Sequence, residues 1–151
     1  MTADNAIARV TYRFKASPNR VFDAWLDPAM AAKWLFAPHE RELARVEIDA
    51  RVGGRFDLVD HRDGEDISHS GTYLEIDRPN RLSFTLFAPK YSPNTTRVTI
   101  SIMALDSGCE LLLVAELTPD LAAVRKDLED GWREIFDELA IALQDSQSGT
   151  A

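Results

Sequence analysis

A periodic apolar segment near the C-terminus, residues 118–143, constrains the fold of this chain more than any other feature. Thr118 is a residue type that caps helices, and Pro119 suits the first helical position. Apolar side chains then recur every three or four residues, which is the spacing of one helical face. They are Leu121, Val124, Leu128, Trp132, Ile135, Phe136, Leu139 and Leu143. We expect a helix of about six turns, whose apolar stripe requires an equally long apolar surface to cover it.

The preceding segment, residues 40–117, has the pattern of strands and turns throughout. Its turn signals are Gly53-Gly54, Asp63-Gly64, Pro79-Asn80 and Ser107-Gly108, with a longer loop from Pro89 to Thr95. Consecutive strands that are joined by tight turns must be antiparallel. We therefore expect a curved antiparallel sheet that wraps around the C-terminal helix.

The N-terminal region adds one strand and two short helices. Apolar and polar residues alternate from Ile7 to Phe14, which is the pattern of a strand. Ser17-Pro18 and Asp27-Pro28 are two helix-start signals ten residues apart. The predicted fold class is α+β: a strand, two short helices, six antiparallel strands and a long helix. We expect one domain over residues 1–143 and a disordered polar tail over 144–151.

We assume hairpin loops of even length and strands without bulges. The turns then determine which side chains share a face of the sheet. The predicted pairs are Leu58 with His69, Phe56 with Gly71, Tyr73 with Leu86, Glu75 with Phe84, Asp77 with Leu82, Ala104 with Leu111, Ile102 with Leu113, and Ile100 with Ala115. This register puts His69 and Glu75 on the same inner face as the apolar residues, opposite the helix.

A strongly curved sheet that grips one helix leaves a gap, and apolar gaps hold small molecules. Gly131 lies mid-helix, where it either admits the sheet closely or leaves space beside Trp132. The residues predicted to line a ligand cavity, and also to close the core, are Trp25, Trp34, Phe56, Leu58, His69, Tyr73, Glu75, Phe84, Leu86, Ile100, Ile102, Leu113, Trp132 and Phe136.

Composition excludes several classes of partner. The formal net charge of −8 disfavours nucleic acid and anionic membrane surfaces, which bind cationic proteins. No apolar run is long enough for membrane insertion. The segment Met1 to Arg9 does not have the pattern of a secretory signal, and a single cysteine, Cys109, fits a reducing compartment. We expect a cytoplasmic protein.

The titratable residues form no established catalytic or metal-binding motif. His39, His61 and His69 lack metal-ligand spacing, and Gly53-Gly54 is not followed by the helix of a phosphate loop. We therefore expect neither a metal nor a cofactor. Two interior polar residues, His69 and Glu75, can contact a ligand, act as acid and base, or be paired with neighbouring groups.

Several stretches, in this order and spacing, resemble the family named after the activator of the heat-shock-protein ATPase, in the START-like (SRPBCC, birch-pollen-allergen-like) superfamily. They are residues 21–28 with Trp34, Asp49 with 53–56, 71–76, 81–84, and Gly131-Trp132 with Leu139. The resemblance spans nearly the whole chain and implies the helix-grip fold and binding of lipids, polyketides or other hydrophobic molecules. Leu35 departs from it, because many relatives carry a second tryptophan there, and this implies a roomier wall.

Three functions from different classes follow. The preferred one is binding of an apolar small molecule. The second is a cofactor-free cyclase, dehydratase or hydrolase that uses His69, Tyr73 and Glu75. The third is a protein-interaction module in stress response, acting on a chaperone as the family name implies. The register also places apolar side chains on the outer face, which favours a homodimer; they are Leu74, Ile76, Phe87, Leu112 and Val114.

Overall fold

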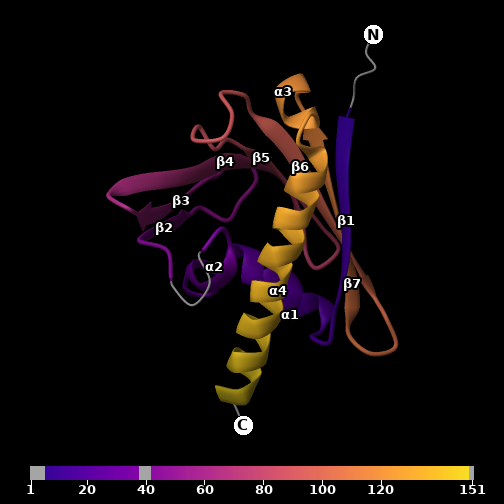
Figure 1. Cartoon of the computed structure of the whole chain (residues 1–151). Coiled ribbons are helices and arrows are strands. Elements are labelled where there is room, and N and C mark those ends of the chain that lie inside the picture. The colour runs from indigo at the N-terminus through magenta and orange to yellow at the C-terminus, as the bar shows by residue number, and fades with distance from the viewer. Residues whose placement is uncertain (1–5, 38–41, 150–151) are drawn as a thin grey trace.

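A computed structural model describes residues 6–37 and 42–149, and it has the predicted α+β architecture (Figure 1). The strands are β1 (Ala6–Phe14), β2 (Arg45–Ile48), β3 (Arg55–Arg62), β4 (Glu65–Asp77), β5 (Arg81–Leu86), β6 (Thr96–Ala104) and β7 (Cys109–Leu117). They form one antiparallel sheet in the order β1-β7-β6-β5-β4-β3-β2. The first strand therefore pairs with the last, and β1 and β2 form the two edges.

The helices are α1 (Pro18–Leu26), α2 (Pro28–Trp34), α3 (Pro119–Ala122) and α4 (Arg125–Gly149). The first three begin at the proline of a predicted start signal, whereas α4 begins at Arg125 without one. The Ser17 hydroxyl accepts a hydrogen bond from the Arg20 N–H, and the Asp27 carboxylate accepts one from the Ala29 N–H. These side chains satisfy backbone donors that have no partner within the first turn of a helix.

The predicted C-terminal helix differs in two respects. It is divided by a turn at residues 123–124 into the short α3 and the long α4. Thr118 precedes α3, but its hydroxyl donates to the Asp120 carboxylate and does not cap the helix. At the other end α4 continues to Gly149, so the segment expected as a tail is helical over most of its length.

Helix α4 lies across the concave face of the sheet (Figure 1). It packs on β1 and on α2, while β2, β3 and the outer part of β4 bend away from it. Helices α1 and α2 fill the space beneath this bend. Within the described residues, no helix is long and apolar enough to cross a membrane.

The β3–β4 hairpin has the predicted register, with Leu58 opposite His69 and Phe56 opposite Gly71. The β4–β5 register is different. Tyr73 pairs with Phe84 and Glu75 with Ser83, because a β-bulge lies between Tyr73 and Glu75. The predicted pairs of Tyr73 with Leu86, Glu75 with Phe84 and Asp77 with Leu82 are therefore wrong.

The bulge reverses the faces of the residues after it. Glu75 leaves the inner face and forms an ion pair with Arg81, with Nε and Oε1 2.9 Å apart. Ile76, predicted outside, turns inward and packs against the core opposite Leu82. The interior position of Glu75 and the outer position of Ile76 are thus both corrected, while Leu74 is exposed as predicted.

The β6–β7 hairpin is shifted by two residues from the predicted register. Ile102 pairs with Leu111 and Ile100 with Leu113, rather than with Leu113 and Ala115. Because side chains alternate with a period of two, this shift leaves every residue on its predicted face. The inner faces of β6 and β7 are accordingly buried.

Candidate functional site

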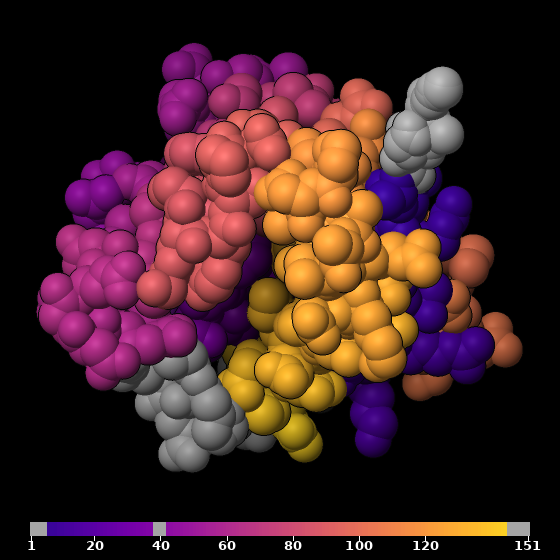
Figure 2. All heavy atoms as spheres, turned by 45° about the horizontal axis from the view of Figure 1, so that its top comes forward, coloured from indigo at the N-terminus to yellow at the C-terminus, as the bar shows by residue number. Residues whose placement is uncertain are grey.

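A cavity with mostly apolar walls lies between the sheet and the N-terminal half of α4, and its volume is about 300 Å³. Its sheet side is formed by Ala8, His69, Leu86, Val98 and Ala115, one from each of five strands. The helix side and the rim are formed by Leu121, Asp127, Leu128, Gly131, Trp132 and Ile135, with Phe36, Ala88, Tyr91, Ser92, Asn94, Thr96 and Leu117. Figure 2 shows the surface hollowed between the β5–β6 loop and the α3–α4 segment.

A wider depression, of about 640 Å³, lies on the outer face of the sheet. Leu74, Thr85, Arg97, Val114 and Glu116 are among the residues that border it. This outer depression is more polar and more open to solvent than the inner cavity. Because ligand sites are concave and mostly apolar, the inner cavity is the candidate site.

The residues predicted to line the cavity fall into three groups. His69, Leu86 and Trp132 do line it. Trp25, Phe56, Tyr73 and Phe84 border a separate void of about 10 Å³ deeper in the molecule. The others, except Glu75, are core residues with almost no exposure: Trp34, Leu58, Ile100, Ile102, Leu113 and Phe136.

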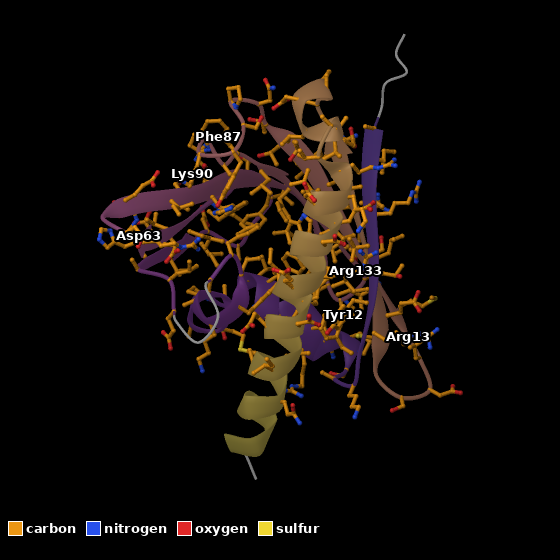
Figure 3. All side chains as sticks on the ribbon, in the orientation of Figure 1. Tyr12, Arg13, Asp63, Phe87, Lys90 and Arg133 are labelled. Carbon is orange, nitrogen blue, oxygen red and sulfur yellow. The ribbon has the colours of Figure 1, made fainter. Side chains whose placement is uncertain are left out.

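The interior is therefore divided along α4. Around Phe136 and Leu139 it is a packed core, in which Trp25 meets Trp34 edge-on at 4.8 Å and Phe136 at 6.1 Å between ring centroids. Figure 3 shows side chains filling this region, with Tyr12 between β1 and α4. The Tyr12 hydroxyl donates to the Asp137 carboxylate at 2.5 Å, and burial raises the pKa of Tyr12 to about 12.

Gly131 faces the open part of the interior. A methyl group at this position would meet no neighbouring element within 4 Å. Of the two explanations offered by the sequence, space beside Trp132 is therefore the correct one. The cavity exists at this level of α4 because a residue without a side chain lies opposite small sheet residues such as Ala8 and Ala115.

His69 is the histidine of the cavity wall. It stacks on Phe36, with ring centroids 4.0 Å apart and planes 6° apart. Burial lowers the pKa of His69 to about 4; the Arg62 charge acts in the same direction, and the Asp60 charge opposes it. The imidazole is therefore neutral at pH 7 and offers one hydrogen-bond donor and one acceptor.

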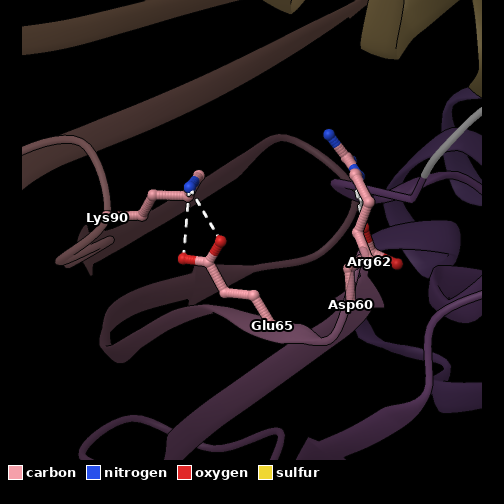
Figure 4. Close-up of polar contacts among 4 residues, drawn as sticks. All are labelled: Asp60, Arg62, Glu65 and Lys90. Atoms are coloured by element: carbon pink, nitrogen blue, oxygen red, sulfur yellow. Dashed lines mark hydrogen bonds and ion pairs between the residues drawn. The ribbon is translucent and has the colours of Figure 1, made fainter.

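Polar contacts hold the β5–β6 loop, which forms one side of the mouth. Asp120 on α3 accepts hydrogen bonds from Ser92 at 2.6 Å and from Asn94 at 2.9 Å. These bonds, with that from Thr118, lower the pKa of Asp120 to about 2. At the other side of the loop, Lys90 contacts both carboxylate oxygens of Glu65 at 3.1 Å (Figure 4).

The end of β3 carries a further ion pair near His69. Asp60 is 3% exposed and pairs with Arg62, with Nη2 and Oδ2 2.9 Å apart (Figure 4). The neighbouring Asp63 lies at the tip of the β3–β4 hairpin, away from α4 (Figure 3). Within residues 6–37 and 42–149, no three His, Cys, Asp or Glu side chains gather as metal ligands do. His39 lies outside the described residues.

Sequence reasoning missed most of the cavity wall. Leu128 and Ile135 belong to the predicted apolar stripe of the helix but not to the residues predicted to line the cavity. Phe36 and Tyr91 lie outside regular elements, where no periodic signal indicates direction. The loop from Pro89 to Thr95 was recognised, but its folding over the end of the cavity follows from contacts to α3 that are distant in sequence.

The curved sheet, the long helix across it and the cavity between them define the helix-grip class of START-like domains. The chain belongs to the family described as Activator of Hsp90 ATPase homolog 1-like protein, whose profile matches residues 15–144. Among proteins with curated descriptions, none matches the chain significantly.

Solved structures agree with this assignment. Protein CV1439 from Chromobacterium violaceum is 31% identical, with a TM-score of 0.75 over 91% of this chain and 96% of that one. Protein NE0264 from Nitrosomonas europaea (21% identity, TM-score 0.80, 98% and 99% covered) shares the fold. So does an AHSA1-like protein from Aeromonas hydrophila (19% identity, TM-score 0.78, 93% and 94% covered).

Proposed function

We propose that this protein binds a hydrophobic small molecule, a lipid, polyketide or aromatic metabolite, in the cavity between the sheet and α4. The observation that carries the proposal is a cavity of about 300 Å³ with mostly apolar walls and an opening to solvent. Ligand sites in proteins span roughly 300–1,000 Å³. The cavity therefore suits a compact ligand rather than a long acyl chain.

The polar groups of the wall are few and lie in defined places. His69 offers a neutral imidazole, and Ser92, Asn94 and Thr96 lie at the loop side. Asp127 brings a carboxylate to the helix side. Such a wall favours a neutral molecule with one or two polar atoms, because an anion would lie near Asp127 without a compensating cation in the cavity wall.

One of the three residues named for the catalytic alternative does not lie in the interior. Glu75 lies on the outer face, paired with Arg81. His69 borders the cavity and Tyr73 the deeper void, so these two do not share one open space. The carrier function is preferred because, of the three residues named for catalysis, only His69 lines the cavity.

The chaperone alternative calls for a different surface. A protein that acts on a chaperone through the outside of its sheet needs no cavity, and a filled interior would favour that function. Here the interior is filled only around Phe136 and Leu139, while the other half is open. We therefore place the functional surface inside.

The test uses two variants at one position. Gly131→Leu places an isobutyl group in the cavity, while Gly131→Ala adds only a methyl group. The protein is purified from its own host, examined by native mass spectrometry, and screened by thermal shift with aromatic metabolites and lipids. We expect a bound mass, or stabilisation that increases with compound concentration, in the wild type and in Gly131→Ala but not in Gly131→Leu.

Two outcomes contradict the proposal. The first is a wild-type protein that is empty and that no compound stabilises. The second is a compound that stabilises Gly131→Leu as strongly as wild type, because that compound would bind outside the cavity. In either case the outer face of the sheet becomes the surface to test, by capture of protein partners.

A further inference from the structure

One buried donor has no partner. Trp25 is 2% exposed, and its indole Nε1–H forms no hydrogen bond within the described residues. The adjacent Trp34 is also buried, but its Nε1–H donates to the Ala24 carbonyl at 3.1 Å. Buried polar groups are paired in the great majority of cases, and an unpaired donor is costly. We therefore infer that the Trp25 N–H donates to an acceptor that is not part of the described residues.

Trp25 borders the small void beneath the cavity. The void is lined by Trp25, Leu35, Phe36, Phe56, Tyr73, Leu82 and Phe84, and its volume is about 10 Å³. That volume is close to the minimum that holds one water-sized group. An acceptor atom of a ligand is of this size, so the void can receive the end of a molecule but not its body.

Phe36 separates the void from the cavity, because it lines both. Its backbone has φ of 60°, a conformation that non-glycine residues rarely adopt. The ring is held by stacking on His69 at 4.0 Å and by an edge contact with Trp132 at 5.3 Å. A strained backbone that is held by ring contacts costs less to displace than a relaxed one.

We propose that Phe36 is a displaceable partition, and that the Trp25 Nε1–H binds a hydrogen-bond acceptor at the leading end of the ligand. The inference rests on the proposed function and narrows it to apolar molecules that end in a ketone, ester or ether oxygen. When the ligand enters, the Phe36 ring leaves its position and the void joins the cavity. The ligand oxygen then accepts from Trp25.

The experiment compares two compounds that differ in the acceptor alone, 2-acetylnaphthalene and 2-isopropylnaphthalene. Their binding is measured by calorimetry and by the indole N–H signals in ¹H–¹⁵N spectra. Trp25→Phe identifies the Trp25 signal by its absence. We expect the ketone to bind wild type about tenfold more tightly than the hydrocarbon, and to shift the Trp25 indole proton downfield where the hydrocarbon does not.

Matched variants distinguish the effect of losing the Trp25 N–H donor from the effect of altered packing. Trp25→Phe removes the N–H and is expected to equalise the two affinities. Trp34→Phe removes a neighbouring N–H that is already paired, and is expected to retain the preference. Phe36→Gly removes the partition and relieves the positive φ, so the preference for the ketone should persist or increase. If Trp25→Phe does not fold, Trp34→Phe and Trp132→Phe identify the other two indole signals, and the remaining signal of wild type is that of Trp25.

The outcomes distinguish this inference from the proposed function. Equal affinities in wild type, with an unmoved Trp25 signal, overturn the role of Trp25 while leaving the cavity as a binding site. Loss of the preference in Phe36→Gly overturns the partition. Binding of neither compound, with no other compound stabilising the protein, overturns both proposals together.

Discussion

One histidine of the cavity wall, His69, makes the stability of the protein depend on pH. His69 is the neutral polar ring among apolar neighbours, and it is stacked on Phe36. Its charged form is disfavoured because burial removes the water that would solvate it. The protonation of this residue is therefore coupled to folding and to any ligand that occupies the cavity.

The first prediction concerns stability in mild acid. The unfolded chain protonates His69 near pH 6.5 and the folded protein only near pH 4, so stability is full above pH 6.5 and is lost as the pH falls from 6.5 towards 4. Between pH 7 and pH 5, wild type should lose about 1–2 kcal/mol more unfolding free energy than His69→Phe. Urea unfolding at both values measures this.

The control for that prediction is a second histidine. His61 lies on β3 with an exposed side chain, hydrogen-bonded to Asp66. His61→Phe should keep the pH dependence of wild type. An identical loss of stability in wild type and in His69→Phe would show that carboxylates elsewhere account for the whole effect.

The second prediction concerns two glycines with opposite surroundings. Gly131→Ala should stabilise the protein by about 0.5–1 kcal/mol, because alanine favours a helix interior and its methyl group enters open space. Gly71→Ala should destabilise it strongly, since the new Cβ would lie 1.8 Å from the Thr85 carbonyl oxygen. Urea midpoints at constant m-value measure both changes; a shift of the same sign in both would contradict the argument.

At the scale of elements, α3 and the β5–β6 loop act as one unit. The Asp120 carboxylate joins Ser92, Asn94 and Thr118, and this group closes one side of the cavity mouth. The start of the loop is attached to β4 by the bridge between Ser70 and Phe87. The local opening of the residues after it should be governed by the Asp120 bonds and by the contact of Lys90 with Glu65.

The third prediction is that Asp120→Ala loosens this loop without unfolding the domain. Trypsin should cleave after Lys90 several-fold faster in the variant, while the far-ultraviolet spectrum stays that of wild type. Asp106→Ala, the same change in the exposed β6–β7 turn, is the control and should leave cleavage after Lys90 unaltered. Equal cleavage rates in all three proteins would refute the role of Asp120.

The sequence predicts the elements well but their register only in part. Turn residues and alternation indicate each strand, and the β3–β4 pairing follows from them. The bulge at Leu74 leaves no clear mark in composition, since Tyr73, Leu74 and Ile76 all suit a strand. One inserted residue there was enough to move Glu75 from the predicted site to the surface.

The location of the cavity was less predictable than the fold. The sequence predicts aromatic residues as its wall, yet Trp34 and Phe136 both contact Trp25 and are fully buried in the core. Open volume depends on the shapes of side chains that meet across 100 residues or more, and on loops without periodicity. Gly131 and Leu35 are the local signals of open volume in the sequence, and Gly131 alone permits two explanations.

At the scale of the whole molecule, the residues that contribute most to stability and the residues that line the cavity lie at different ends of α4. Phe136 and Leu139 are fully buried in the packed half, whereas Leu128 borders the cavity and is partly exposed. Removing a buried ring leaves unfilled space among close-packed neighbours, but removing a side chain that already faces a cavity forfeits fewer contacts.

The fourth prediction follows from this division. Phe136→Ala should cost about 3–5 kcal/mol, a large part of the 5–15 kcal/mol that is typical of a domain. Leu128→Ala should cost no more than about 1 kcal/mol and should change ligand affinity instead. Guanidinium unfolding of both variants measures this difference, and comparable losses would show that the two halves of α4 are packed alike.

The residues of the cavity wall contribute little to folding stability, so they can be substituted during evolution without unfolding the protein. Substitutions at Tyr91, Leu121 or Leu128 can reshape the pocket while the ring cluster around Phe136 keeps the chain folded, so new specificities need not pass through unstable ancestors. Under the proposed ligand-binding function, a lineage built on this plan can therefore exchange one bound compound for another by a few substitutions near the cavity mouth.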